Sequence, residues 1–126
     1  MIFIFYSATI IPNYQNERIM EIFLKTVSAL NDETRLLILR FLDEYGECCV
    51  CDLQESLHMI QSRLSRHLKI LKEAGFVSVE RKGVWAHYRI RSPLDRFRTE
   101  ALQEIRHLAI DLPILKKSSQ KGSCKI

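Results

Sequence analysis

The sequence predicts a mainly α-helical domain with a small β-hairpin, and three observations support this fold class. Apolar residues recur every three or four positions along most of the chain, which is the spacing of one helix face. Between residues 77 and 90 the period changes to two, the spacing of a strand. With 126 residues and 47% hydrophobic content, the chain supports one domain with an adequate core.

Four helices are predicted before the hairpin. The first runs from Met20 to Leu30 and carries an approximate helical stripe. Asn31 and Asp32 are good capping residues, so a second helix begins there and ends at Gly46. The other two helices are predicted over Cys49–Leu57 and Ser62–Ala74.

A two-stranded hairpin is predicted over residues 77–90, where apolar and polar side chains alternate. Pairing Arg81 with Val84 leaves two residues for the turn. This register places Val79 opposite Ala86, so that one face of the hairpin is apolar throughout.

A last helix is predicted after Pro93, with an apolar stripe suited to a partner helix. Its apolar residues are separated by 3, 4, 4, 3 and 4 positions. They are Leu94, Phe97, Ala101, Ile105, Leu108 and Leu112. We therefore expect the terminal helices to form a dimer.

Charge is divided unevenly along the chain. Residues 1–60 hold 4 Lys and Arg against 9 Asp and Glu, a balance of −5, whereas residues 61–126 hold 15 against 6, a balance of +9. A basic second half suits a polyanionic partner, although it also serves as a solubilising surface.

Two short helices followed by a two-stranded ribbon form a winged helix-turn-helix. The chain also carries four familiar motifs in order, which are residues 30–35 (LNDETR), 49–53 (CVCDL), 65–71 (SRHLKIL) and 85–90 (WAHYRI). Together they resemble the ArsR/SmtB family of metal-responsive bacterial repressors. The resemblance covers Met20 to Leu112, and the cysteine motif is similar to that of the arsenic- and antimony-sensing branch.

The resemblance implies that residues 62–74 form a recognition helix in the major groove of operator DNA. Candidate base readers are Gln61, Ser62, Arg63, Ser65 and Arg66, because Arg suits guanine and Gln suits adenine. His67 is expected to meet a phosphate or a neighbouring side chain. The side chains expected to neutralise phosphates are Lys69, Lys72, Arg81, Lys82 and Arg89.

On this basis the chain has three parts. Residues 1–19 are an N-terminal extension, residues 20–112 are the DNA-binding and dimerisation domain, and residues 113–126 are a polar, flexible tail. Met1 to Ile11 is apolar, but it is too short to span a bilayer and lacks the features of a signal peptide. It either packs on a dimer partner or lies upstream of a true start at Met20.

Three of the four cysteines, Cys48, Cys49 and Cys51, lie within four positions at the predicted start of a helix. Neighbouring cysteines are poorly placed to bridge one another, and the chain has no framework of spaced pairs. We therefore expect reduced thiols in a cytoplasmic protein. Thiolates favour soft ions such as trivalent arsenic and antimony over hard cations.

Cys49 and Cys51 match the motif of the arsenic-sensing branch, but the position of its usual third cysteine holds Gln54. Three replacements are open. Cys48 is local and is our first choice, although adjacent residues diverge in regular structure. Cys124 lies nine residues past Leu115 and spans up to about 30 Å. An exogenous thiol is the third.

Helical geometry suggests how an ion would act. Cys49 and Cys51 would lie about 200° apart around an ideal helix, so their sulfurs could not converge while that helix stays regular. Ion binding would then distort the helix that supports the recognition helix. A coupling of about 1–3 kcal/mol lowers DNA affinity roughly 5- to 150-fold.

The leading prediction is a homodimeric, cytoplasmic repressor that binds double-stranded operator DNA and is released by arsenite or antimonite. It has no permanently bound cofactor, no membrane partner and no enzymatic activity. The same fold could instead sense cadmium, lead, zinc or thiol oxidation. A thiol redox enzyme is disfavoured because the chain lacks a Cys-x-x-Cys motif. The Asp-x-His pair of the zinc-sensing branch is absent too.

Overall fold

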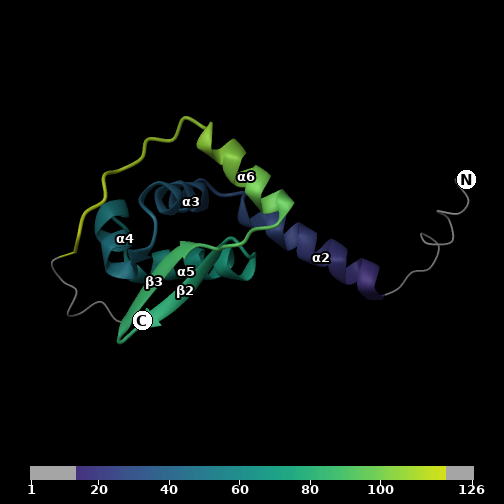
Figure 1. The fold of residues 1–126 in the computed structure, drawn as a ribbon, viewed down its shortest axis with the longest axis horizontal. Helices are drawn as coiled ribbons and strands as arrows, with labels where there is room; N and C mark the ends of the chain where they lie inside the picture. The colour runs from purple at the N-terminus through teal and green to yellow at the C-terminus, as the bar shows by residue number, and fades with distance from the viewer. Residues whose placement is uncertain (1–13, 119–126) are drawn as a thin grey trace, which may run out of the picture.

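The computed structural model describes residues 14–118, and its fold is shown in Figure 1. The elements in chain order are α2 (Tyr14–Ala29), α3 (Glu33–Tyr45), β1 (Cys48–Cys49), α4 (Val50–Leu57), α5 (Gln61–Glu73), β2 (Val77–Lys82), β3 (Trp85–Ile90) and α6 (Arg96–Arg106). The mainly helical fold class with a small hairpin is confirmed. Helices α4 and α5 and the hairpin form a winged helix-turn-helix.

Local capping fixes the start of two helices. The carboxylate of Asp32 accepts the backbone N–H of Arg35 at 3.0 Å and caps α3, as predicted. Asp95 caps α6 in the same way, by accepting the N–H of Arg98 at 3.0 Å. Helix α3 ends at Tyr45, and its C-cap is Gly46, whose φ of 78° suits glycine.

The predicted start of the first helix and the predicted end of the last helix were wrong. Helix α2 begins at Tyr14, which is upstream of Met20. Helix α6 ends at Arg106, so Leu108 and Leu112 lie beyond it. The guanidinium of Arg40 explains this end, because its Nη1 donates to the carbonyls of Ile105, Arg106 and Leu108 at 3.1–3.4 Å.

The sheet has three antiparallel strands in the order β1-β3-β2, one more than predicted. The hairpin register also differs by two residues, since Val79 pairs with Tyr88 and Lys82 pairs with Trp85. Gly83 has a φ of 69° and occupies the first turn position, as in a type II′ turn. A shift of two preserves side-chain parity, so the predicted apolar face survives.

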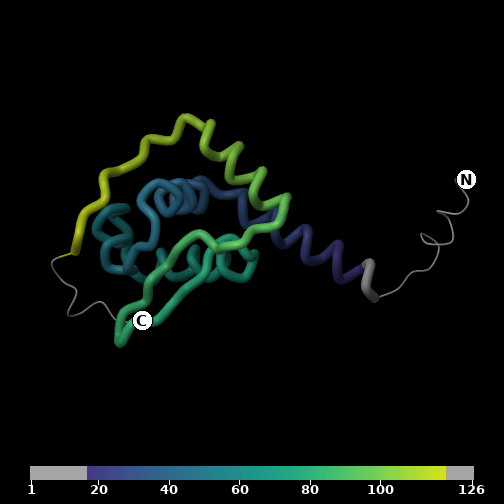
Figure 2. The backbone as a smooth tube through the Cα atoms, viewed as in Figure 1, coloured from purple at the N-terminus to yellow at the C-terminus, as the bar shows by residue number. Residues whose placement is uncertain are grey.

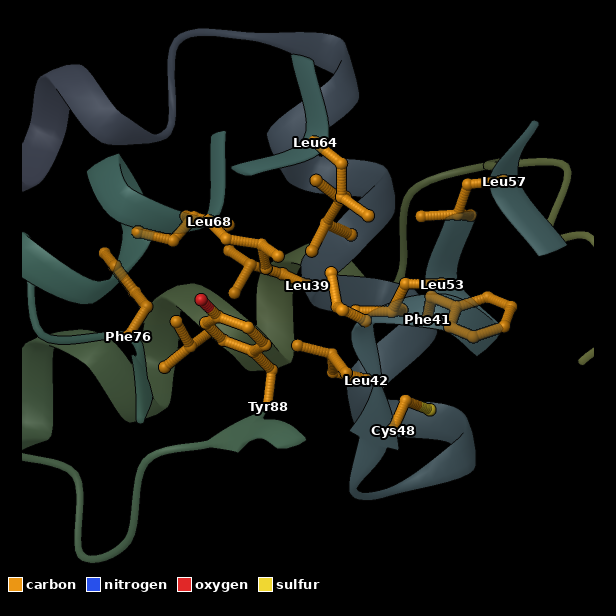
Figure 3. Packing of buried hydrophobic residues seen from close by; sticks show 14 of the residues in the cluster. Leu39, Phe41, Leu42, Cys48, Leu53, Leu57, Leu64, Leu68, Phe76 and Tyr88 are labelled. Atoms are coloured by element: carbon orange, nitrogen blue, oxygen red, sulfur yellow. The ribbon is translucent and has the colours of Figure 1, made fainter. Parts of the chain in front are cut away.

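The core lies between α3, α4, α5 and the hairpin (Figure 3). Its largest fully buried side chains include Phe41, Phe76, Leu39, Leu53 and Leu68. Cys48 belongs to the same cluster. The thiol region is therefore an edge of the hydrophobic core.

After α6 the chain runs without regular structure past α3 to α4 (Figure 2). We call residues 112–118 the strap. The hydroxyl of Tyr45 donates to the carbonyl of Pro113 at 3.4 Å, and Ser56 of α4 bonds Lys116. Between residues 14 and 118, no helix has the length and apolar content needed to cross a bilayer.

Candidate functional site

Helix α5 separates its apolar and polar side chains. Leu64, Leu68 and Leu71 are fully buried against the core. The opposite face exposes Ser62, Arg63, Arg66, Lys69 and Lys72, while Gln61 and Ser65 are half-buried. All seven of these residues therefore lie on the second helix of the helix-turn-helix, away from its buried leucines.

His67 meets a neighbouring side chain, which is one of the two partners expected for it. Its side chain is only 12% exposed, and its Nδ1 lies 3.3 Å from Nη1 of Arg35 on α3. Since Arg35 can only donate, Nδ1 accepts and the ring is neutral. Burial holds the pKa of His67 below its usual range, while Asp32 opposes this shift. His67 thus contacts α3.

The start of α5 has an unusual cap. Ile60 occupies the N-cap position, is 69% exposed and makes no side-chain cap bond. Its carbonyl accepts the N–H of Leu64 at 3.1 Å, which is the first helical bond. A serine or aspartate at this position would satisfy an additional backbone N–H.

The wing carries the other predicted cations. Arg81, Lys82 and Arg89 are exposed on β2 and β3. The ammonium of Lys82 lies 2.6 Å from the carboxylate of Glu47, which lies just before β1. This bond raises the pKa of Lys82 and lowers that of Glu47. Nδ1 of His87 is 3.5 Å from the same carboxylate.

The cysteines span a strand and a helix, which corrects the predicted helix start at Cys49. Cys48 and Cys49 form β1 and pair with Tyr88 and His87 of the wing strand β3. Cys49 is also the N-cap of α4, with φ −69° and ψ 148°, so only Cys51 lies within the helix. The 200° argument for two cysteines on one helix therefore does not apply.

All three sulfurs belong to buried residues, at 2–3% exposure. Burial raises the pKa of the Cys48 thiol to about 11, and Asp52 adds to the rise. Cys48 and Cys49 are free thiols, whereas Cys51 is engaged in a disulfide. The expectation of reduced thiols is therefore wrong for Cys51. Its disulfide partner is neither Cys48 nor Cys49, because both of these are free thiols.

Within residues 14–118, no three His, Cys, Asp or Glu side chains gather closely enough to hold a metal ion. Cys48, Cys49 and Cys51 adjoin one another in the chain without forming a preassembled three-sulfur site. Cys124 lies outside the described residues.

Sequence reasoning missed three residues at this site. Glu47 joins β1 to the wing, and Asp52 and Ser56 of α4 bond the strap. The sequence signal for Asp52 was weak, namely that it is an acidic residue directly after Cys51. No local pattern could reveal the strap, because its bonds join residues 60 to 68 positions apart.

The thiol region touches both elements of the DNA-binding fold. Strand β1 is paired with β3 of the wing. Helix α4 ends at Leu57, and the left-handed backbone of its C-cap His58 (φ 53°) turns the chain toward α5. The junction of β1 and α4 therefore connects directly to both the wing and α5.

The sequence profile described as "Bacterial regulatory protein, arsR family" matches residues 32–79. The chain is 41% identical over 75 residues to the arsenical resistance operon repressor of Escherichia coli (strain K12), across 60% of this chain and 64% of that protein. It is 48% identical over 60 residues to the arsenical resistance operon repressor of Bacillus subtilis (strain 168), across 48% of this chain and 57% of that protein. The matches span less than two thirds of both relatives.

Two further relatives extend the comparison. An uncharacterized HTH-type transcriptional regulator of Methanocaldococcus jannaschii is 43% identical over 74 residues, across 59% of this chain and 79% of that protein. A cadmium resistance transcriptional regulatory protein CadC homolog of Staphylococcus aureus is 34% identical over 64 residues, across 51% of this chain and 53% of that protein.

Solved structures agree with the fold. Reduced HlyU from Vibrio cholerae superposes with a TM-score of 0.60 at 25% identity, over 79% of this chain and all of that chain. A homodimeric winged helix-turn-helix DNA-binding domain from Mycobacterium bovis gives 0.64 at 23% identity, over 75% of this chain and 84% of that one. The sequence relatives are transcriptional regulators and not enzymes. The chain belongs to the arsR family of bacterial regulatory proteins.

Proposed function

We propose that the protein is a homodimeric cytoplasmic repressor that binds double-stranded operator DNA and is released when trivalent arsenic or antimony binds its cysteines. The observation that carries this proposal is the position of the thiols. Three buried cysteines occupy the one junction that is paired with the wing and leads into the recognition helix.

DNA binding is supported by the exposed faces of α5 and the wing. Arg63 and Arg66 stand near the start of α5, where a recognition helix meets base edges. Lys69 and Lys72 continue along the same helix, and Arg81, Lys82 and Arg89 extend the basic surface onto the wing. These later cations suit phosphates and position the protein without reading sequence.

Dimerisation is supported by the apolar surface of α2. Ile19, Met20, Ile22, Leu24 and Val27 are 40–63% exposed, and α2 projects from the body of the domain (Figure 1). Phe23 of α2 and Phe97 of α6 are in ring contact, with centroids 5.3 Å apart, and are also exposed. Such a patch is large for a monomer surface, and we assign it to a second copy of this chain.

The donor chemistry fits the inducer. Cys49 and Cys51 supply two sulfurs, and a third thiol comes from Cys48, from Cys124 or from outside the protein. Binding of arsenous acid breaks three As–O bonds and forms three As–S bonds. The three thiol protons leave with the hydroxides as water, and no electrons are transferred. Cys51 must be in the thiol form for this exchange.

In this proposal, DNA is released because ion binding changes the junction of β1 and α4, and not because α4 alone is distorted. Drawing Cys49 and Cys51 together changes the end of β1 and the first turn of α4. Strand β1 transmits that change to the wing and α4 transmits it to α5. Ion and DNA then favour different conformations, so each lowers the affinity for the other by the same factor.

The proposal is tested by fluorescence anisotropy with a labelled duplex that the protein selects from a random library. Under a phosphine reductant, arsenite and antimonite should release the wild-type protein. Cys49→Ser and Cys51→Ser should stay bound at the same concentrations. Release of both variants at wild-type concentrations, or no release of the wild type, would contradict the proposal.

Two observations favour a second candidate input to the same repressor. The disulfide at Cys51 favours sensing of thiol oxidation, and the cadmium-resistance relative favours a borderline metal such as cadmium, lead or zinc. The same anisotropy assay separates these inputs. Release by cadmium or by peroxide, without release by arsenite, would replace the first candidate with the second.

A further inference from the structure

Helix α2 is joined to the rest of the domain at its last turn. Its first part projects away from the other elements (Figure 1), and between residues 17 and 29 only Thr26 and Ala29 are buried. Two arginines from other helices bond this last turn. They are Arg35 of α3 and Arg98 of α6, whose side chains are 12% and 19% exposed. The orientation of α2 on the domain is therefore set at this end.

The guanidinium of Arg35 contacts α2 on one side and α5 on the other. Its Nε donates to the carbonyl of Ala29 at 2.7 Å, and its Nη2 donates to that of Ser28 at 3.3 Å. Its Nη1 lies 3.3 Å from Nδ1 of His67, at the middle of α5. Carbonyls at a helix C-terminus carry partial negative charge, so a cation suits this position. One side chain thus connects the end of α2 with the centre of α5.

The guanidinium of Arg98 makes a second connection, at the end of α5. Its Nη2 donates to the hydroxyl of Thr26 at 3.0 Å, and its Nε donates at 2.9 Å to the carbonyl of Ala74, the C-cap of α5. The hydroxyl of Thr26 in turn donates to the carbonyl of Ile22 at 2.9 Å. Asp95 accepts from Nη1 at 2.6 Å. All three nitrogens of Arg98 are therefore engaged, which holds its side chain in one geometry.

These two connections outweigh the exposed contact between the same helices. Lys25 of α2 and Glu73 of α5 lie 3.8 Å apart, but both side chains are exposed, and such ion pairs contribute little. A planar guanidinium has several donors in a fixed arrangement and can bond two elements at once. Hydrogen bonds to charged, largely buried groups are costly to break. Arg35 and Arg98 therefore determine how α2 is held relative to α5.

The arrangement of α2 and α5 decides where the two recognition helices of a dimer lie. In the proposed dimer, α2 carries the surface that packs on the second copy, so each α5 is placed relative to the dimer axis through α2. The half-sites of a helix-turn-helix dimer lie about 34–36 Å apart, and each added base pair turns one of them by about a tenth of a turn. A rigid connection therefore selects one spacing, whereas a loose connection accepts several.

We infer that Arg35 and Arg98 are positioning residues that set the half-site spacing at which the dimer binds its operator. The inference rests on the proposed dimer and on the proposed binding of DNA by α5. Each arginine acts through the two helices that it joins, because its guanidinium is bonded within the protein.

Fluorescence anisotropy with a series of duplexes tests this inference. The duplexes carry the half-sites of the library-selected duplex at its own spacing, or with one or two base pairs inserted or removed between them. A further duplex carries one half-site. Arg35→Ala and Arg98→Ala should lower the ratio of affinities between the best spacing and its neighbours by roughly two- to thirtyfold. Affinity for the single half-site should stay close to that of wild type, since the exposed face of α5 is unchanged.

Thr26→Val covers the case in which an arginine variant does not fold. It has nearly the same shape as threonine and removes the acceptor of Arg98 on α2, so the ratio should fall here too. Arg96→Ala is the matched control, because Arg96 is an exposed arginine of α6 that bonds Glu100 of its own helix. It should keep the wild-type ratio. Light scattering and urea unfolding show whether each variant is a folded dimer.

An unchanged ratio in folded, dimeric Arg35→Ala and Thr26→Val, or a wild type that binds every spacing alike, would overturn the inference. An equal loss of affinity on every duplex, the single half-site included, would also overturn it, because that result shows a structural role alone. The proposed function is read separately from release by arsenite. A wild type that arsenite does not release would contradict that function and would leave the comparison of spacings unaffected.

Discussion

The exposed side chains of α5 divide into two kinds, and this division gives the first prediction. Arg66→Ala should abolish tight operator binding, because a base contact is worth about 1–3 kcal/mol and also fixes register. Lys69→Ala should instead weaken all duplexes alike and reduce the salt dependence by about one phosphate. Anisotropy at several salt concentrations measures both, and urea unfolding should show little change. Tight, specific binding by Arg66→Ala would refute its role.

His67 gives a prediction about pH. Burial keeps its pKa lowered in the folded protein, with Arg35, Arg63 and Arg66 adding to the effect and Asp32 opposing it. The unfolded chain protonates near pH 6.5. The stabilisation by neutral His67 is therefore complete above that pH and is lost as pH falls toward the folded pKa.

Urea unfolding at pH 7.5 and pH 5.5 should show that the wild type loses more stability than His67→Gln, whose amide oxygen can still accept from Arg35. The rest of the chain is the same in both proteins, so its contribution cancels in the comparison. Equal losses in the two proteins would show that His67 is not held neutral by the fold.

Residue types and spacing were enough to predict which side chains of α5 are exposed, because that depends on helical period alone. The inward turn of His67 could not be predicted in the same way. Its partner, Arg35, is 32 residues away and belongs to a different helix. The bonds of Asp52 to the strap depend on even longer separations.

Among the elements, the pairing of β1 with the wing predicts that Glu47 helps to couple ion binding to DNA release. Glu47→Gln removes the ionic contact with Lys82 and loosens the connection of β1 to β2. The ratio of operator affinities without and with arsenite should fall, by roughly two- to thirtyfold. Glu80→Gln, an exposed carboxylate on the wing, is the control. An unchanged ratio in Glu47→Gln would exclude this route.

The missing side-chain cap of α5 gives a stability prediction. Ile60→Ser should stabilise the protein by about 1 kcal/mol, because the hydroxyl can accept a first-turn N–H. Ile60→Ala removes the exposed apolar side chain without adding a cap and should stay within about 0.5 kcal/mol of wild type. The urea midpoint of each variant is the measurement. Equal midpoints for Ser and Ala would show that the first turn needs no such acceptor.

Element types were predictable and element partners were not. Helical period, caps at Asp32 and a strand period of two identified the helices and the hairpin. The two-residue strand Cys48–Cys49 has no period of its own and exists because β3 pairs with it. The predicted hairpin register was wrong because the turn was placed at residues 82 and 83. In the structure Gly83 is the first of the two turn residues, so Lys82 pairs with Trp85.

At the scale of the molecule, a second copy would pack on the exposed apolar residues of α2 and on the adjoining ring of Phe97 from α6. Helix α2 is anchored to its own domain by Thr26 and Ala29, which are buried, while its apolar residues on other sides are exposed. Thr26 accepts a hydrogen bond from Arg98 of α6 at 3.0 Å. A charged substitution on the exposed side should therefore separate the subunits without unfolding them.

Phe23→Asp, at a position 48% exposed, should convert the protein from dimer to monomer in light scattering after size exclusion. Operator affinity should fall with it, since a dimer holds two half-sites at once and a monomer loses that multivalency. Ile114→Asp places the same charge on an exposed apolar residue of the strap and should remain dimeric, because the strap segment runs beside α4 and away from α2 (Figure 1). A Phe23→Asp protein that stays dimeric would place the dimer interface elsewhere. If it instead becomes a monomer that still binds arsenite with wild-type affinity, the inducer site must be complete within one subunit.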